Sequence, residues 1–334
     1  MSAAPEIDGK TSSSRPWIKL DYIVRNEREA NGVYNDYISS FCGDKFFVKR
    51  LYDLVEGNSA FLKLLNKQDL KKELTECYSA ICLAERALRR RRYSTSSKMD
   101  LNGTQICLPC DTIQRNLLFS INSITSEDLI NHNFAHEEPL LTFSAIRENI
   151  KNLAFYDVCS GKGILSFLIA ILFPEIPQIV MIDSNADMKL DHLTSECCSN
   201  ITFQKQDIHS VDFADFLVSE SEKCRLLNRI PIIIGLHLCG TLSTRLTQLY
   251  NSNEGLPVLI VSPCCAPTRS KKNKVFMTRE RLRQNKWSSY SFWYMNVYVS
   301  ICPLLSVKDI VKDELVLSEK NTLILALKRS FLPS

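Results

Sequence analysis

The sequence predicts an α/β protein built on a mostly parallel β-sheet, and three observations support this fold class. Beyond about residue 126, short apolar runs typical of strands alternate with stretches of helical spacing, which is the pattern of a parallel sheet covered on both faces. The chain then closes with two apolar runs separated by a short polar turn. The glycines that could shape a ligand loop stand directly after the first apolar run.

Five strands and four helices follow from this alternation. Four of the strands are followed by a helical stretch, as in a doubly wound sheet. The expected strands are 154–158, 179–182, 201–204, 230–236 and 257–261, and the helices between them are 163–173, 186–198, 211–219 and 242–250.

The two ends of the chain differ from this central pattern. Residues 310–317 and 322–327, joined by 318–321, predict an antiparallel hairpin that completes a seven-stranded sheet. At the other end, residues 1–14 are small and polar and predict a disordered tail. Apolar residues at helical spacing then predict a helical N-terminal region over residues 15–120, so that the α/β domain covers residues 121–334.

The composition is that of an ordinary soluble globular protein. The chain of 334 residues is 45% hydrophobic and 23% charged, and its net charge of +4 is too small to indicate a nucleic-acid partner by itself. The first 17 residues hold no apolar signal core, and the longest apolar run is far shorter than the roughly 20 residues of a membrane span. We therefore expect a cytoplasmic protein, with the nucleus as the alternative, whose 13 cysteines are mostly free thiols.

The strongest motif is Asp-Val-Cys-Ser-Gly-Lys-Gly at residues 157–163, directly after the first strand. Gly161 and Gly163 would let the backbone approach a ligand at the strand–helix turn. A partial G-x-G-x-x-G match is weak support for a dinucleotide, and Asp157 would repel an anionic pyrophosphate at this turn. The same carboxylate would attract the ammonium and sulfonium of S-adenosylmethionine (AdoMet), which carries no phosphate.

Two further acids follow the next two strands. Asp183 ends the second strand, 20 residues after Gly163, where a carboxylate can accept both hydroxyls of a ribose. Asp207 follows the third strand, where an acceptor for an adenine amino group would lie. Each acid alone is more often a helix cap or an ordinary residue at a strand end, but open sheets bind ligands at the carboxyl ends of consecutive strands.

The later loops carry a resemblance to a known family. Gly-Leu-His-Leu-Cys-Gly at 235–240 and Ser-Pro-Cys-Cys at 262–265, together with the first loop, resemble one branch of class I AdoMet-dependent methyltransferase domains, which have a Rossmann-like fold. That branch includes tRNA 2'-O-methyltransferases and glutathione S-transferase C-terminal-domain-containing proteins. His136-Glu137 is similar to a pair that these domains carry before the first strand. The resemblance covers roughly residues 126–334 and implies AdoMet as the cofactor.

The resemblance also assigns roles to residues of these loops. It implies that Cys159, His237, Cys239 and Gly240 line the cofactor site, with His237 beside the transferred methyl group as a catalytic candidate; an ordinary buried histidine is an equal alternative. Cys264 and Cys265 are assigned to substrate binding. These thiols could be nucleophiles, but a role as small packing residues is the stronger expectation, because nothing in the sequence indicates that their pKa is lowered.

Two departures from the family pattern bear on these roles. The family usually has glycine where Cys159 stands, and a turn that needs a positive φ there would be strained. The tRNA-modifying relatives follow Cys-Cys with histidine, whereas Ala266 follows here, so we expect no metal at the pair. A zinc site formed by Cys107, Cys110, His132 and His136 is a lesser alternative, because the gap between the two pairs exceeds that of a usual zinc finger.

One basic segment suggests a substrate. Residues 269–286 hold eight Lys or Arg and one acid, and several aromatic residues follow. Basic groups beside stacking surfaces suit RNA, and we assign Arg269, Lys271, Lys272 and Lys274 to substrate binding. A solvated helix face is nearly as good an interpretation. For a second basic run, residues 89–92, we favour a solvated helix end, and a nucleic-acid contact is the second interpretation.

The expected function is therefore AdoMet-dependent methyl transfer, with RNA, and tRNA in particular, as the favoured substrate. A protein methyltransferase and a non-catalytic binding module that kept the fold are the alternatives.

Overall fold

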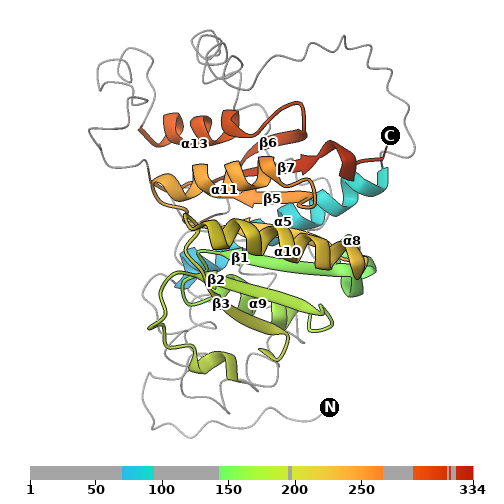
Figure 1. The fold of residues 1–334 in the computed structure, drawn as a ribbon, viewed down its shortest axis with the longest axis vertical. Coiled ribbons are helices and arrows are strands. Elements are labelled where there is room, and N and C mark those ends of the chain that lie inside the picture. Colours follow the sequence, from blue (N-terminus) through green and yellow to red (C-terminus); the bar gives the residue numbers. More distant parts are fainter. Residues whose placement is uncertain are drawn as a thin grey trace, which may run out of the picture.

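The computed structural model describes residues 70–93, 143–194, 198–265, 289–313, 316 and 321–333. These residues form a seven-stranded sheet in the order β3-β2-β1-β4-β5-β7-β6 (Figure 1). The first five strands run parallel, and β7 lies antiparallel between β5 and β6. This confirms the predicted α/β Rossmann-like fold with its C-terminal antiparallel pair. The strands are β1 (Leu153–Val158), β2 (Gln178–Asp183), β3 (Ile201–Lys205), β4 (Ile230–Gly235), β5 (Val258–Val261), β6 (Ser306–Lys312) and β7 (Thr322–Lys328).

Burial explains why the central strands have continuous apolar sequences. Every residue of β1, β4, β5 and β7 is buried, because helices cover both faces of the sheet. Most residues of the edge strands β3 and β6 are half-buried or exposed instead. The continuous apolar strands therefore lie inside the sheet, and the two more polar strands form its edges.

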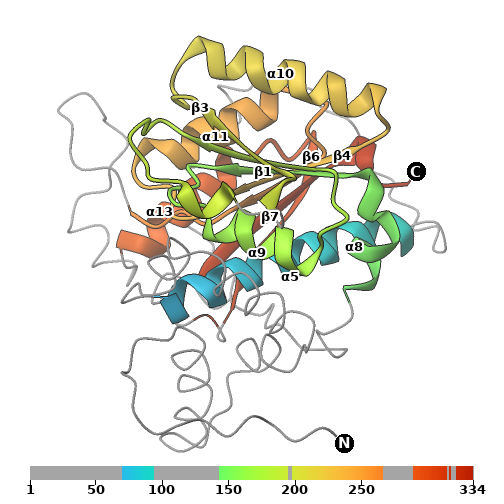
Figure 2. The same ribbon diagram turned by 90° about the horizontal axis from the view of Figure 1, so that it is seen from below.

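Two layers of helices enclose the sheet, as Figure 2 shows edge-on. One hydrophobic cluster packs the first layer against one face, and a second cluster packs the other layer against the opposite face. The first layer consists of α5 (Leu70–Tyr93), α8 (Ser144–Asn149) and α9 (Ile164–Leu172), and the second of α10 (Val211–Leu226), α11 (Thr241–Ser252) and α13 (Ser289–Ser300). Short 3-10 turns occupy Ile150–Asn152, Asp191–Thr194 and Arg329–Phe331.

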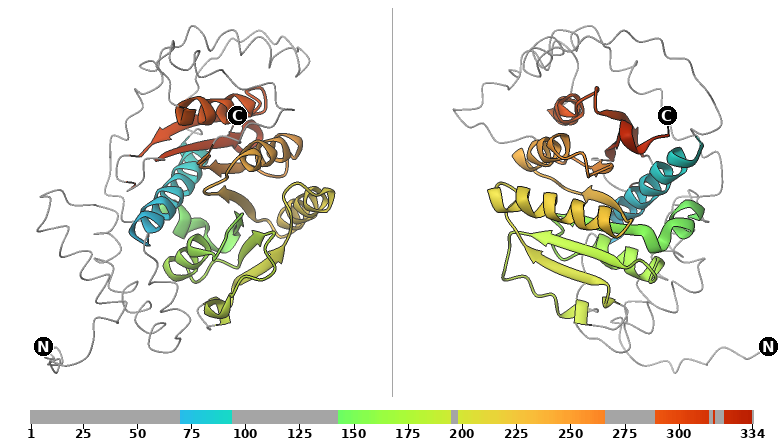
Figure 3. Two further views of the ribbon diagram at one scale, coloured as in Figure 1. Left: turned by 90° about the vertical axis from the view of Figure 1, so that its left-hand side faces the viewer. Right: turned by 45° about the vertical axis from the view of Figure 1, so that its right-hand side comes forward.

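Helix α5 is an integral part of the sheet domain. All nine residues of α9 are buried, and a helix that is apolar all round needs a cover on its outer side. α5 contacts α9, α8, β5 and β7, and the left panel of Figure 3 shows it on the same side of the sheet as α9. Its Glu85 carboxylate also accepts hydrogen bonds from the backbone N–H groups of Ala145 and Ile146 at the start of α8. The expected boundary near residue 120 stays a prediction, but α5 shares one core with the sheet.

Three elements differ from their predicted bounds by more than two residues. The expected helix over 186–198 is reduced, within its described part, to the turn at Asp191–Thr194, because Asp183 and Asn185 accept backbone N–H bonds that compete with a helix. α10 continues beyond 219 because Ser221 and Cys224 extend its buried stripe. β6 starts at Ser306 and ends at Lys312, earlier than predicted, since charged residues are tolerated on an edge strand.

Two general expectations can be compared with the described part of the chain. Among its helices, none combines the length and the apolar character needed to cross a bilayer. The nine cysteines within the described ranges are all free thiols, as expected.

Candidate functional site

A pocket of about 210 Å³ opens at the carboxyl ends of β1 and β4. Its walls come from the loop after β1, the start of α9, the loop after β4 and helix α5. A second cavity, of about 420 Å³, lies beside α5, α8 and the amino end of β4. Open α/β sheets bind ligands at the carboxyl ends of their strands, so the first pocket is the candidate site. Its lining residues are Glu73, Cys77, Asp157, Cys159, Ser160, Gly161, Lys162, Ile164, Leu165, Leu236 and His237.

The loop between β1 and α9 has the left-handed backbone that its glycines predict. Gly161 and Gly163 have φ of 52° and 72°, and Cys159 has φ of 58°. A Cβ on Gly163 would lie 2.3 Å from the terminal methyl carbon of Met181, so glycine also permits the close packing of this loop on β2. Cys159 thus occupies the strained conformation that the sequence analysis considered, at the position where the resembled family has glycine.

Asp157 is a buried carboxyl in the wall of the pocket. It is 4% exposed, and its Oδ2 accepts a hydrogen bond of 2.8 Å from the Ser166 hydroxyl. Burial raises the pKa of Asp157 to about 7; the bond from Ser166 opposes this rise and the nearby Asp183 adds to it. A group in this state is costly to ionise in the free protein and would gain from a cationic ligand.

Asp183 and Asp207 lie beyond the pocket at the ends of the next two strands. Asp183 Oδ2 accepts from the Gly161 N–H at 3.0 Å, and Oδ1 accepts from the Asn185 N–H at 2.9 Å. Asp207 is exposed, and its Oδ1 accepts from the His209 N–H at 2.9 Å. The structure therefore brings the three acids to consecutive strand ends, while their proposed ribose and adenine contacts stay predictions.

His237 faces a residue that the sequence analysis missed. Its Nε2 lies 2.6 Å from Oε2 of Glu76, which comes from α5. The Glu76 side chain is 7% exposed and that of His237 41%, so the pair joins a buried carboxylate to an accessible imidazole. Neither carboxylate oxygen of Glu76 has a partner of hydrogen-bond geometry, so the close contact with His237 is an ion-pair distance and not a formed hydrogen bond. No sequence signal marks Glu76, because α5 was assigned to a separate region.

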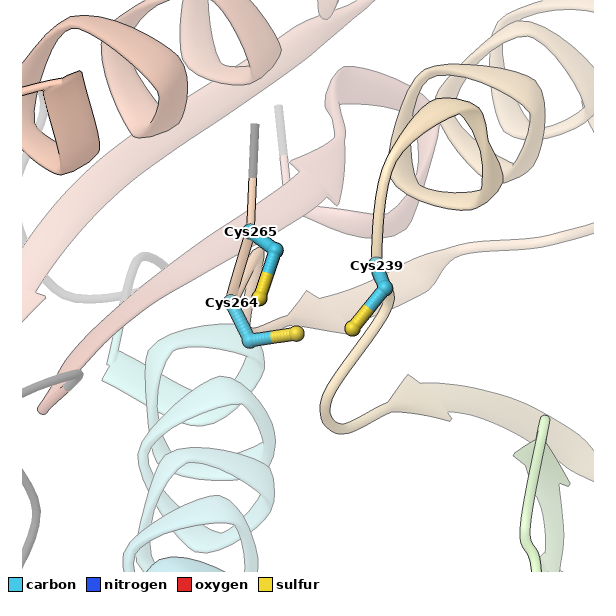
Figure 4. Close-up of side chains that lie close together, drawn as sticks. All are labelled: Cys239, Cys264 and Cys265. Carbon is cyan, nitrogen blue, oxygen red and sulfur yellow. The ribbon is translucent and has the colours of Figure 1, made fainter. Parts of the chain in front are cut away.

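Three cysteines converge beside the loop after β4, which also carries His237. The loop after β4 carries Cys239, and the loop after β5 carries Cys264 and Cys265; all three sulfur atoms lie within 4.8 Å of one another (Figure 4). The Gly240 N–H donates to the Cys265 carbonyl at 2.9 Å, which holds the two loops together. Cys264 is buried, Cys265 half-buried and Cys239 exposed.

The two basic runs have different outcomes. In α5, the arginines pair within the protein: Arg90 contacts Asp309 at 2.6 Å and Arg92 contacts Glu148 at 2.7 Å. This favours the interpretation of a helix end over a nucleic-acid contact. Arg269, Lys271, Lys272 and Lys274 lie outside the described residues, as do the candidate zinc ligands Cys107, Cys110, His132 and His136.

A family model described as a methyltransferase domain matches residues 130–271. The match covers less than half of the chain, and it includes the ends of all five parallel strands, from which the acids, His237 and the cysteines come. No curated protein matches the chain. The fold and this match together support a methyltransferase, whereas the particular relatives suggested by the motifs stay a prediction.

Proposed function

We propose that the chain is an AdoMet-dependent methyltransferase whose methyl donor binds in the pocket beside the β1–α9 loop. The observation that carries this proposal is the buried carboxyl of Asp157 in the pocket wall, with the ionisable His237 lining the same pocket. The match to a methyltransferase domain supports the class of reaction.

The residues of the pocket fit a cationic donor. Asp157 is mostly desolvated, and the ammonium of AdoMet would compensate the cost of ionising it. A Cβ at Gly161 would have no atom within 4 Å, so space is free above the loop for the methionine part. Each Asp183 oxygen accepts one backbone bond and keeps a lone pair for a ribose hydroxyl. Asp207 would accept from adenine.

The loop cysteines and Gly240 complete the proposed cofactor site. Cys159 lines the pocket directly, while Cys239 and Gly240 follow His237 at the start of α11. Gly240 has φ of 59°, which suits a turn where backbone approaches a ligand. We assign these residues to contacts with the adenosine part.

His237 is the proposed general base, and Glu76 its positioning residue. Glu76 beside Nε2 leaves Nδ1 as the nitrogen that can take a proton from the substrate nucleophile. The buried carboxylate would hold the ring and stabilise the imidazolium that forms. AdoMet supplies an activated methyl group, so the protein contributes mainly orientation and the removal of this proton.

Two measurements test this function. Calorimetry should show micromolar AdoMet binding by the wild type that is lost in Asp183→Ala; a well-folded wild type that binds no AdoMet would contradict the proposal.

With a labelled methyl donor and total RNA, His237→Ala should lower kcat by about 100-fold or more. Glu76→Gln should lower kcat without changing the KM for AdoMet, and Glu76→Asp should recover part of the rate. Glu222→Gln, on the exposed surface of α10, is the matched control.

RNA, and tRNA in particular, is the proposed substrate. The support is the basic sequence of residues 269–286, which starts four residues after Cys265. Exchange of Lys271, Lys272 and Lys274 for Glu should weaken RNA binding and flatten its salt dependence. Methyl incorporation that is sensitive to protease and resistant to ribonuclease would favour a protein substrate instead.

A non-catalytic binding module is the second candidate, and Cys159 is the observation that favours it. A side chain with φ of 58° in the first loop is a departure that could weaken the binding of a donor. AdoMet binding that appears only in Cys159→Gly would support this candidate.

A further inference from the structure

The three cysteines beside the pocket come from two loops that the backbone holds in place. The Leu238 N–H donates to the Ser262 carbonyl at 3.3 Å, and the Gly240 N–H donates to the Cys265 carbonyl at 2.9 Å. These bonds flank Cys239 on both sides. The cysteine triad, defined as Cys239, Cys264 and Cys265, is therefore preorganised by the sheet.

The spacing of the sulfur atoms suits a single metal ion. All three Sγ atoms lie within 4.8 Å of one another, and Figure 4 shows them turned toward a common point. Three thiolates bound to one Zn²⁺ at about 2.3 Å, with tetrahedral angles, lie about 3.8 Å apart. Small side-chain rotations would close the remaining distance.

We propose that the cysteine triad binds a thiophilic divalent metal ion, Zn²⁺ by preference, with a fourth coordination position open. Three sulfur ligands select soft or borderline metals over Mg²⁺ or Ca²⁺. Among the described residues, no other Cys, His, Asp or Glu places a ligand atom in this group. Residues 266–288, which follow the triad in the sequence, contain neither Cys nor His. Because Cys239 is exposed, water or a substrate atom can take the open position.

This inference does not rest on methyl transfer, although Cys239 also belongs to the proposed cofactor site. The sequence predicted no metal at the Cys264–Cys265 pair, because no histidine follows it. That prediction did not consider Cys239, which the structure adds as a third sulfur from another loop. Cys239 lies two residues after His237, so the ion would sit beside the proposed catalytic histidine. It would also cross-link the loops after β4 and β5, and metal binding would then stabilise the folded state.

Metal binding must release the thiol protons. Burial raises the pKa of the Cys264 thiol, and the neighbouring Cys239 and Cys265 raise it further. Up to three S–H protons therefore leave to solvent as three S–Zn bonds form, and the bound site carries one net negative charge. Affinity should accordingly increase with pH.

The test uses the reduced full-length chain, without oxygen, titrated with Co²⁺ and then with Zn²⁺. Cobalt should bind as one ion per chain with a thiolate-to-cobalt absorption band, and Zn²⁺ should abolish the band. Cys239→Ser and Cys264→Ser should each weaken binding by about 100-fold or more, since even the loss of a residue that only hydrogen-bonds to a metal ligand costs about 10–100-fold. Cys302→Ser is the control for the loss of a thiol outside the triad and should leave metal binding unchanged.

A second variant separates the triad from the other possible zinc ligands. Cys107→Ser with Cys110→Ser should keep the cobalt band; loss of the band in this variant, but not in Cys239→Ser, would overturn the proposal. A reduced wild type without any thiolate–cobalt band would also overturn it. Cys239→Ser is the decisive exchange, because its exposed position makes misfolding the least concern, and circular dichroism checks the fold of Cys264→Ser. AdoMet calorimetry on the wild type, with and without the metal ion, distinguishes failure of the cofactor site from failure of the metal site.

Discussion

Replacing Asp157 with Asn should stabilise the free protein at neutral and alkaline pH. Asp157 is buried, and its pKa is raised to about 7 from an ordinary value of 3.8. The folded state therefore holds this proton more tightly than the unfolded state, and the free energy of unfolding falls as pH rises from about 4 to about 7. Asn does not ionise, so the variant escapes this loss. Its amide oxygen can still accept the hydrogen bond from Ser166.

The magnitude follows from the size of the shift. The pKa changes by about three units, from 3.8 to about 7. At about 1.4 kcal/mol per unit, the stability lost by the wild type above pH 7 is at most about 4 kcal/mol. The advantage of the variant should grow by up to about 1.4 kcal/mol per pH unit between pH 5 and 7 and then level off.

Urea unfolding of wild type and variant at several pH values between 5 and 8.5 measures this difference. Asp215→Asn, an exposed exchange of the same chemistry on α10, is the control and should leave a difference that does not change with pH. If the Asp157→Asn advantage is flat across the range, or decreases as pH rises, burial does not control this carboxyl and the reasoning is wrong.

The same exchange connects stability to ligand binding. A carboxylate that destabilises the free protein becomes favourable when a cation pairs with it, so Asp157→Asn should bind AdoMet more weakly while unfolding less readily. Opposite signs in the two measurements would distinguish a ligand-binding carboxylate from a residue that only packs.

Three further exchanges test the strained loop and a buried charge. Cys159→Gly should increase the free energy of unfolding by about 1 kcal/mol and so raise the melting temperature, because φ of 58° suits glycine. An unchanged melting temperature would argue against strain at this position. Gly163→Ala should lower the urea midpoint, at a cost of about 1–2 kcal/mol for its left-handed backbone plus displacement of Met181, and a variant as stable as wild type would contradict this. Lys328 is fully buried, and its Nζ lies 4.7 Å from the ring centre of Tyr250. Lys328→Ala should lower the free energy of unfolding by about 2–3 kcal/mol, and Lys328→Met should lower it much less, because Met keeps the apolar stem. Equal losses in urea would show that the charge matters more than the stem.

Much of the fold could be predicted because it follows from local patterns. Buried strands such as β1 and β4 have continuous apolar sequences, and the turn after β1 needs left-handed residues such as Gly161 and Gly163. Consecutive parallel strands end at one edge of the sheet, so Asp183 and Asp207 could be expected near each other. The helix expected after β2 was wrong because side chains there bond to neighbouring N–H groups, and such local competition leaves little trace in apolar periodicity.

By itself, the sequence determined the sheet, the first loop and the acids at the strand ends, because periodicity and turn chemistry act between near neighbours. Only the tertiary structure decided which distant residues complete the site. Glu76 precedes His237 by more than 150 residues, and α5 brings them together by covering the apolar outer face of α9. Cys239 meets Cys264 and Cys265 because β4 and β5 are neighbours in the sheet and backbone bonds join their loops. Such contacts depend on packing across the sheet, and no spacing along the chain encodes them.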